Sequence, residues 1–109
     1  MKTGTLEVLN RLSETLFARR NADPSTSYTA SLLAKGPDAI LKKIGEESAE
    51  LIMAAKDGKR LQIVNEATDV VYHVLVLMAF FDMSAEDILQ EMHRREGISG
   101  IDEKRSRTA

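Results

Sequence analysis

Apolar residues recur at three- and four-residue intervals along most of the chain, which is the spacing of one face of an α-helix. Leu9, Leu12 and Leu16 show it in a first segment, from about Thr5 to Arg19. Helices are also predicted in four further segments, which cover residues 28–35, 37–57, 60–81 and 84–97. No run shows convincing strand alternation. The pattern therefore predicts an all-α protein.

Residues that begin or end helices divide these segments. Ser27 is a predicted N-cap, and Gly36 ends the short helix that follows it. Pro37 suits the first turn of the next helix, because its missing N–H would be unpaired there in any case. Gly58 supplies the positive φ that a helix C-terminus commonly needs. Ser84 opens the last predicted helix in a pattern that resembles a capping box.

The segment 70–81 is the most apolar stretch of the chain and is followed at once by Asp82. It is too short to cross ~30 Å of hydrocarbon, so we expect a buried helix and no membrane partner. A helix that is apolar nearly all round needs more neighbours than four short helices supply. We therefore expect four to five helices around a central antiparallel hairpin, with the bundle completed by a homodimer.

Residues 1–97 are predicted to form a single domain, followed by a polar, basic tail at 98–109. The 109 residues include 15 Lys and Arg against 17 Asp and Glu, a net charge of −2. This balance argues neither for nor against nucleic acid, and we expect none as a partner. The absence of cysteine excludes disulfides and zinc–thiolate sites. The first seven residues hold no apolar signal segment, so the expected location is the cytoplasm.

Four carboxylates are placed symmetrically about Gly58. Glu47 and Glu50 lie 11 and 8 residues before it, and Glu66 and Asp69 lie 8 and 11 residues after it. If Gly58 marks the turn of two antiparallel helices, Glu50 faces Glu66 and Glu47 faces Asp69. Acids gathered in this way repel one another unless they splay into water, share protons or hold a cation.

The third possibility makes the acids a candidate metal site. Magnesium prefers oxygen ligands and typically lies between carboxylates, waters and substrate phosphates. Carboxylate-bound iron is the rival in helical bundles, but such sites use Glu-x-x-His, and neither His73 nor His93 follows a glutamate by three residues. Exposed helices also carry acids at this spacing without any function, so a solvated acidic face remains the alternative.

Other polar residues near the acids have both structural and functional interpretations. Lys42 and Lys43 are surface charges or bind phosphate as point charges. His73 is interpreted as a hydrogen-bonded interior histidine, and Tyr72 as a packing residue. Five basic residues near the C-terminus are solvated or close over an anionic ligand, namely Arg94, Arg95, Lys104, Arg105 and Arg107.

The acid pattern resembles that of the MazG-type all-α nucleotide pyrophosphohydrolases, which have Glu-Glu-x-x-Glu on one helix and Glu-x-x-Asp on the next. It stands here as Glu46-Glu47-x-x-Glu50 and Glu66-x-x-Asp69. Within that superfamily the chain is similar to the phosphoribosyl-ATP pyrophosphatase family of histidine biosynthesis. The similarity covers nearly the whole chain, including Ser27-Tyr28-Thr29, Lys42-Lys43-Ile44-Gly45, Tyr72-His73 and Ser99-Gly100-Ile101.

This resemblance implies magnesium-dependent hydrolysis of 1-(5-phosphoribosyl)-ATP to the corresponding AMP compound and pyrophosphate. The implied metal ligands, which are also catalytic candidates, are Glu47, Glu50, Glu66 and Asp69. Glu46 is implied as a further catalytic acid that supports a ligand or orients water. The implied substrate-binding residues are Lys42, Lys43, Ser27, Tyr28, Lys104 and Arg107.

Two other functions compete with this one. A house-cleaning dNTP or dUTP pyrophosphohydrolase on the same scaffold would discriminate between bases and would need no pocket for an extra phosphoribosyl group. A helical dimer that serves only as an interaction module would leave its acids solvated and would show no magnesium-dependent hydrolysis.

Overall fold

A computed structural model describes residues 3–108, which form six α-helices, one short 3₁₀ helix and no strand. The elements are α1 (Thr3–Ala18), η1 (Arg19–Asn21), α2 (Tyr28–Lys35), α3 (Pro37–Asp57), α4 (Arg60–Phe80), α5 (Ala85–Arg94) and α6 (Gly100–Thr108). The all-α prediction is confirmed. Residues 1–2 and 109, which belong to the predicted domain and tail, lie outside the described residues.

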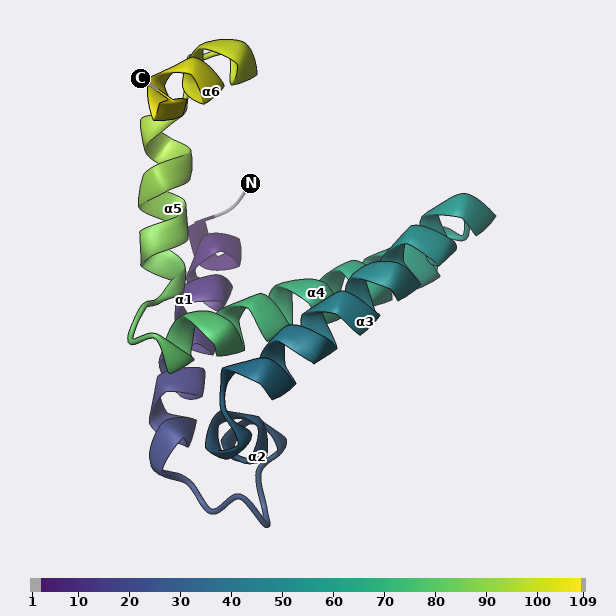
Figure 1. Ribbon diagram of the computed structural model, residues 1–109, viewed down its shortest axis with the longest axis vertical. Helices are drawn as coiled ribbons and strands as arrows, with labels where there is room; N and C mark the ends of the chain where they lie inside the picture. Colours follow the sequence, from purple (N-terminus) through teal and green to yellow (C-terminus); the bar gives the residue numbers. More distant parts are fainter. Residues whose placement is uncertain (1–2, 109) are drawn as a thin grey trace.

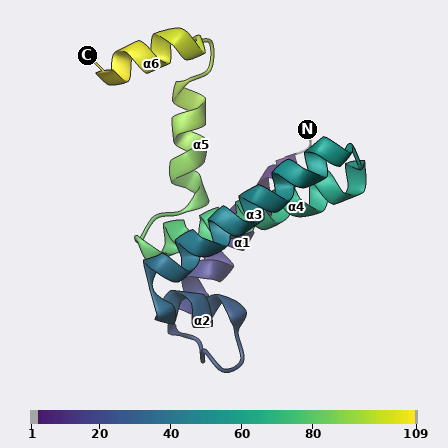
Figure 2. The ribbon, with the colours of Figure 1, turned by 45° about the vertical axis from the view of Figure 1, so that its right-hand side comes forward.

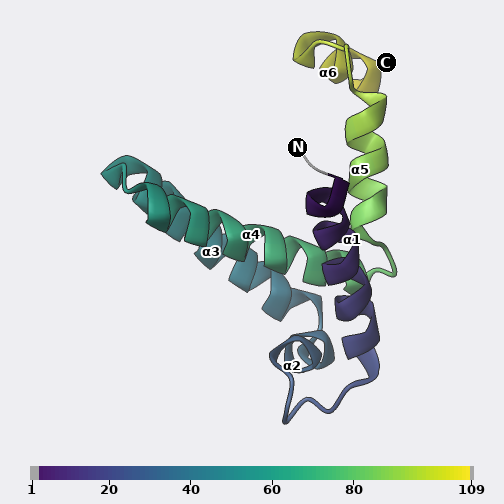
Figure 3. The ribbon, with the colours of Figure 1, turned by 180° about the vertical axis from the view of Figure 1, so that it is seen from behind.

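The two longest helices, α3 and α4, form the predicted antiparallel hairpin and lie side by side in every view (Figures 1, 2 and 3). Gly58 makes the turn with a left-handed backbone, φ 69°. Its N–H donates to the carbonyls of Ala54 and Ala55, both at 3.1 Å, and so satisfies the end of α3. Each helix has 21 residues, and the hairpin brings one face of α3 against one face of α4.

The predicted residues that begin or end α2, α3 and α5 are also confirmed, although α5 ends at Arg94, before the predicted end near Gly97. The Ser27 hydroxyl accepts a hydrogen bond from the Ala30 N–H at 3.2 Å and begins α2. Gly36 ends α2 with φ 95°, and α3 starts at the next residue, Pro37. Ser84 forms a capping box, in which its N–H donates to the Asp87 carboxylate at 2.9 Å.

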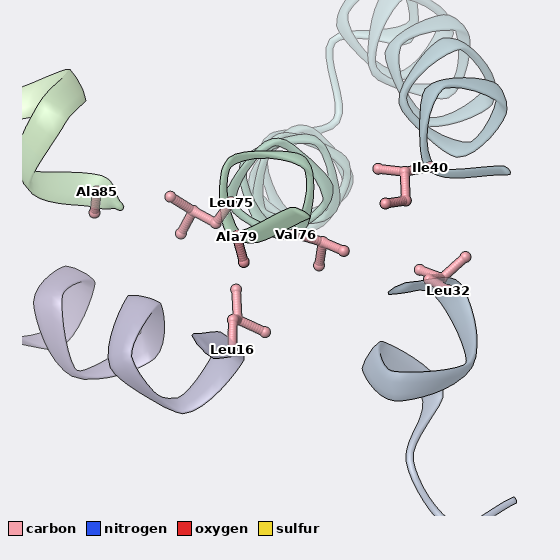
Figure 4. Close-up of a cluster of buried hydrophobic side chains, with 7 residues drawn as sticks. All are labelled: Leu16, Leu32, Ile40, Leu75, Val76, Ala79 and Ala85. Carbon is pink, nitrogen blue, oxygen red and sulfur yellow. The ribbon is translucent and has the colours of Figure 1, made fainter. Parts of the chain in front are cut away.

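The core lies at one end of the hairpin, where α1, α2 and α5 meet the C-terminal half of α4 (Figure 4). Its buried apolar residues are Leu16, Leu32, Ile40, Leu75, Val76, Ala79 and Ala85. The tip of the hairpin projects beyond this core (Figure 1). The radius of gyration is 15.8 Å, against about 13 Å for a compact chain of this size, so one chain alone is unusually open.

Part of α4 is exposed in the part of the chain that the structure describes. Val71 is 48% exposed and Val64 is 60% exposed, although both lie in the most apolar helix. An apolar hollow lies between α1, α4 and α5, lined by Leu9, Val70, Val71, Val74, Leu75, Ile88, Leu89 and Met92. By length and composition alone α4 is able to cross a membrane, but it also carries Glu66 and Asp69 on the side that faces α3. We therefore interpret α4 as the central helix of a bundle.

The C-terminal segment forms a helix that the sequence analysis treated only as a polar tail. α6 crosses the end of α5 at the opposite end of the molecule from α2 (Figures 1 and 3). Ser99 begins α6, because its hydroxyl accepts a hydrogen bond from the Asp102 N–H at 3.1 Å. Glu103 holds α6 to α5 through Arg94, whose Nη2 lies 2.6 Å from a Glu103 oxygen.

A candidate metal centre in the helical hairpin

Three of the four acids predicted to face one another converge in the middle of the hairpin. One carboxylate oxygen from each of Glu47, Glu66 and Asp69 lies within 4.8 Å of the other two. Glu47 comes from α3, and the other two acids come from α4, one turn apart. Glu50 lies one turn after Glu47 and interacts with both Glu47 and Glu66. We call Glu47, Glu50, Glu66 and Asp69 the acid group.

The carboxylates of this acid group perturb one another. Glu66 raises the pKa of Glu50, chiefly through a side-chain hydrogen bond, and Glu47 raises it further. A hydrogen bond between two carboxyl groups requires that one of them keeps a proton, and nearby negative charge makes that proton harder to lose. Without a cation, the neighbouring acids therefore make the charged form of Glu50 less favourable.

One oxygen of the acid group lacks any hydrogen-bond partner among the described residues. Oε2 of Glu66 is buried, and neither a side chain nor a backbone N–H reaches it. A buried carboxylate oxygen without a partner is costly, since it has lost water and gained nothing in return. A divalent cation bound between three or four carboxylates supplies the missing partner, and an all-oxygen donor set suits Mg²⁺. The residues present therefore fit a hard divalent cation.

Lys43 stands at the edge of the acid group, one turn before it on α3. Its Nζ lies 3.3 Å from Oε1 of Glu47 and 3.7 Å from Oε2 of Glu46. The hydrogen bond to Glu47 is the largest cause that raises the pKa of Lys43, so the ammonium stays charged. Glu46 itself is exposed and is not part of the three-residue group of converging oxygens.

Two adjacent residues of α2 are hydrogen-bonded to two adjacent residues of α4. The Tyr28 hydroxyl lies 2.8 Å from Nε2 of His73, and the Thr29 hydroxyl is hydrogen-bonded to that of Tyr72. His73 is 5% exposed, and its Nδ1 lies 2.7 Å from the backbone oxygen of Asp69. These contacts place the N-terminus of α2 beside the acid group and confirm His73 as a hydrogen-bonded interior residue.

The remaining sequence candidates are placed differently. Ser27 uses its hydroxyl to cap α2, and Lys42 is exposed on α3. Lys104 and Arg107 lie on α6, at the far end of α5 from the body of the chain (Figure 2). Nε of Arg107 lies 3.5 Å from a Glu103 oxygen. Within one chain the structure does not bring these two basic residues to the acid group.

Sequence reasoning missed the bond between Tyr28 and His73 and the role of Glu103. Tyr28 and His73 are 45 residues apart, and no local pattern links them. A signal for α6 was present, because Ser99 followed three residues later by Asp102 is an N-cap pattern. Glu103 also precedes Arg107 by four residues, the spacing of an ion pair on one helix face.

The fold and the acid group together define an all-α protein with a carboxylate cation site between two antiparallel helices. Residues 9–96 match the family described as phosphoribosyl-ATP pyrophosphohydrolase. The chain belongs to this family.

Curated relatives agree over nearly their whole length. A phosphoribosyl-ATP pyrophosphatase of Dechloromonas aromatica is 73% identical over 103 residues, which is 94% of this chain and 95% of the relative. The phosphoribosyl-ATP pyrophosphatases of Aromatoleum aromaticum and of Azoarcus sp. are each 57% identical, with the same shares of both chains covered. The family resemblance inferred from the sequence is confirmed.

Proposed function

We propose that this protein hydrolyses 1-(5-phosphoribosyl)-ATP to 1-(5-phosphoribosyl)-AMP and pyrophosphate in histidine biosynthesis, with Mg²⁺ as its cofactor. The family and the close relatives support the reaction. The observation that carries the metal is the acid group itself, in which Oε2 of Glu66 is buried without a partner. We expect the enzyme to act in the cytoplasm, without nucleic acid or membrane as a partner.

In this proposal Glu47, Glu50, Glu66 and Asp69 hold the cation. When bound, Mg²⁺ would neutralise charge on the triphosphate and on the leaving pyrophosphate. The contribution of the protein is to position the ligands. The hairpin holds the four carboxylates on two helices, so that little reorganisation is needed when the cation and the phosphates bind. A carboxylate oxygen of the acid group that does not bind the cation would accept a hydrogen bond from the attacking water.

The basic residues near the acid group would bind the phosphates. Lys43 keeps its charge beside Glu47, and its ammonium has three N–H donors to share between acids and phosphate. Lys42 lies on the same helix and is exposed. Glu46 pairs with Lys43 at 3.7 Å, which suits a supporting role in which it orients that lysine. Ser27 and Tyr28 would contact the substrate from the start of α2.

The deciding experiment is a comparison of substrates. Pyrophosphate release is measured from 1-(5-phosphoribosyl)-ATP and from a panel of dNTPs that includes dUTP, each with and without Mg²⁺. We expect a higher kcat/KM for the phosphoribosylated nucleotide and no turnover after chelation. A preference for the dNTPs would assign the protein to house-cleaning hydrolysis, and no metal-dependent release from any nucleotide would favour an interaction module.

We also propose that the protein works as a homodimer, which covers the apolar hollow between α1, α4 and α5. Met92 lines this hollow and is 61% exposed, too much for a large apolar side chain in a finished core. Met92→Lys is therefore expected to fold but to have the mass of a monomer in size-exclusion chromatography with light scattering. Gln90→Lys, on the same helix but outside the hollow, is the control and is expected to remain dimeric. A monomeric wild type would contradict this proposal.

In such a homodimer, α6 of one chain would lie near the acid group of the other chain. Lys104 and Arg107 are proposed to bind phosphate, yet α6 lies far from the acid group of its own chain (Figure 1). A substrate contact from these residues therefore requires the acid group of a partner chain. Mixing an Asp69→Asn chain with an Arg107→Ala chain tests this, because partial recovery of activity is expected only if the two chains complete one site.

A further inference from the structure

The hydrogen positions between Tyr28, His73 and Asp69 follow from the chemistry of the three groups. Nδ1 of His73 lies 2.7 Å from the backbone oxygen of Asp69, and a carbonyl oxygen only accepts hydrogen bonds, so Nδ1 carries the hydrogen. In a neutral imidazole Nε2 is then an acceptor. The Tyr28 hydroxyl, 2.8 Å from Nε2, must donate its hydrogen to the ring.

The neighbouring contacts join α2 to α4 around this arrangement. The His73 ring packs edge-to-face against Tyr28 and Tyr72, with centroids 5.8 and 5.4 Å apart. The bond between Thr29 and Tyr72 fixes the neighbouring residue of α2 to the neighbouring residue of α4. The direction of the Tyr28 hydroxyl is therefore set by its own bond to His73, and the Thr29–Tyr72 bond joins the two helices independently.

Tyr28 lies close to the acid group. The charges of Lys43, Glu47 and Asp69 all act on this phenol. Burial, the largest cause, raises the pKa of Tyr28, so the hydroxyl keeps its proton at neutral pH. Because that proton is already donated to His73, only oxygen lone pairs are presented to a bound nucleotide.

A hydroxyl that can only accept discriminates between the parts of a nucleotide. Phosphate oxygens are acceptors and gain nothing from it, whereas a sugar hydroxyl is a donor and pairs with it. We propose that Tyr28, oriented by His73, accepts a hydrogen bond from a hydroxyl of the ribose attached to the α-phosphate, and that the enzyme thereby prefers ribonucleotides to deoxyribonucleotides. The inference rests on the proposed function, which places the triphosphate at the acid group. His73 is a positioning residue, because it acts through Tyr28.

Kinetics with deoxy substrates test this inference. The probes are 1-(5-phosphoribosyl)-ATP and its analogues that lack the 2′- or the 3′-hydroxyl of the adenosine ribose. We expect the wild type to lose about tenfold or more in kcat/KM on one analogue, because a site built to pair a hydroxyl rejects a ligand without it. Tyr28→Phe is expected to lose activity on the parent substrate and to treat parent and analogue alike.

Two further variants separate orientation from packing. His73→Phe keeps an aromatic ring between the two tyrosines but removes the acceptor, so the Tyr28 hydroxyl is free to turn and the preference for ribose is expected to shrink. Tyr72→Phe also removes a hydroxyl bonded between α2 and α4, and it is expected to keep the preference. An unchanged preference in Tyr28→Phe, or an equal loss of preference in Tyr72→Phe, would overturn the proposal.

A measurement without substrate checks the hydrogen positions directly. The chain has only two histidines, so the ¹⁵N resonances of His73 and His93 are readily assigned. In the metal-free protein at neutral pH we expect His73 to carry its hydrogen on Nδ1, and Tyr28→Phe to shift its Nε2 resonance while His93 stays unchanged. A hydrogen on Nε2 of His73 would overturn the assignment of Tyr28 as donor.

The outcomes also distinguish this inference from the proposed function. If the wild type fails to hydrolyse 1-(5-phosphoribosyl)-ATP, the proposed function fails and the ribose contact falls with it. If the wild type hydrolyses that substrate and both deoxy analogues equally well, the proposed function stands and only the role of Tyr28 is wrong.

Discussion

Among the residues that the structure describes, two glutamates each have a buried side-chain oxygen without a hydrogen-bond partner, and their surroundings are opposite. Oε2 of Glu66, in the hairpin, is surrounded by other acids. Oε1 of Glu103, on α6, lies 3.5 Å from Nε of Arg107 and 3.8 Å from Nε of Arg95, and the other Glu103 oxygen pairs with Arg94.

The charges around each glutamate distinguish a carboxylate that stabilises the fold from one that belongs to a candidate metal site. Around Glu103 positive charge from three arginines compensates the acid, so the contact is complete without any ligand and holds α6 on α5. Around Glu66 the neighbouring charges are those of the other acids. Lys43 pairs with Glu46 and Glu47, and the remaining repulsion is relieved by protons or by a bound cation. Burial without a partner is therefore evidence for a ligand in the hairpin, whereas in α6 it reflects an ion pair that is slightly too long to count as a hydrogen bond.

The largest expected effect comes from neutralising one member of the acid group. Asp69→Asn keeps the shape of the side chain but removes a charge that the cation needs, so kcat is expected to fall by about 10³ or more. Glu50→Gln is expected to be similarly inactive. Asp57→Asn, which changes an exposed acid at the end of the same hairpin, is the control and should leave kcat within twofold. Near-normal turnover in Asp69→Asn would count against shared metal binding.

The next effect is on stability. Mg²⁺ at a hundred times its Kd is expected to raise the free energy of unfolding of the wild type by about 2.7 kcal/mol, because it binds only the folded hairpin. In Glu66→Gln this gain is expected to vanish, while the metal-free variant melts higher than the metal-free wild type since one repelling charge is gone. Thermal melting with MgCl₂ and with EDTA measures both. A variant that melts lower without metal would show that the acids do not repel one another.

The corresponding substitution on α6, Glu103→Gln, is expected to destabilise its surroundings, whereas Glu66→Gln stabilises the metal-free hairpin. Glu103→Gln leaves Arg94, Arg95 and Arg107 without their shared acid, so α6 is expected to lose about tenfold in amide hydrogen-exchange protection. The protection of the α3/α4 hairpin should not change. Glu96→Gln, an exposed acid near the same helix, serves as the control. If α6 stays protected in Glu103→Gln, other contacts hold it in place.

The smallest effect is a difference in pH dependence. Arg94 is the largest cause that lowers the pKa of Glu91 to about 2, so its contribution is complete above the ordinary pKa of 4.5 and is lost as the pH falls from there toward 2. The pKa of Glu50 is raised, so the metal-free hairpin gains stability as the pH falls through that raised value toward 4.5. Amide chemical shifts of α5 and of the hairpin, followed from pH 7 to pH 2, report the two regions separately. Glu91→Gln should remove the acid transition of α5 alone.

Most of the fold was predictable because it depends on local signals. Periodic apolar residues marked the helices, and Ser27, Gly36, Pro37 and Gly58 marked their ends through capping and backbone geometry. The convergence of Glu47, Glu66 and Asp69 was predictable as well, since two antiparallel helices joined at a known turn place residues at equal distances from it opposite one another. α6 was missed because its apolar periodicity is weak and it depends on an ion pair with another helix.

The sequence by itself determined the all-α class, the hairpin about Gly58 and the family, because spacing, caps and motif are all properties of nearby residues. Only the tertiary structure decided which buried charges are compensated and which are not. It placed three arginines around Glu103, and it joined Tyr28 to His73 across 45 residues. Electrostatic balance and hydroxyl orientation depend on distances between separate helices, and no pattern within one helix contains those distances.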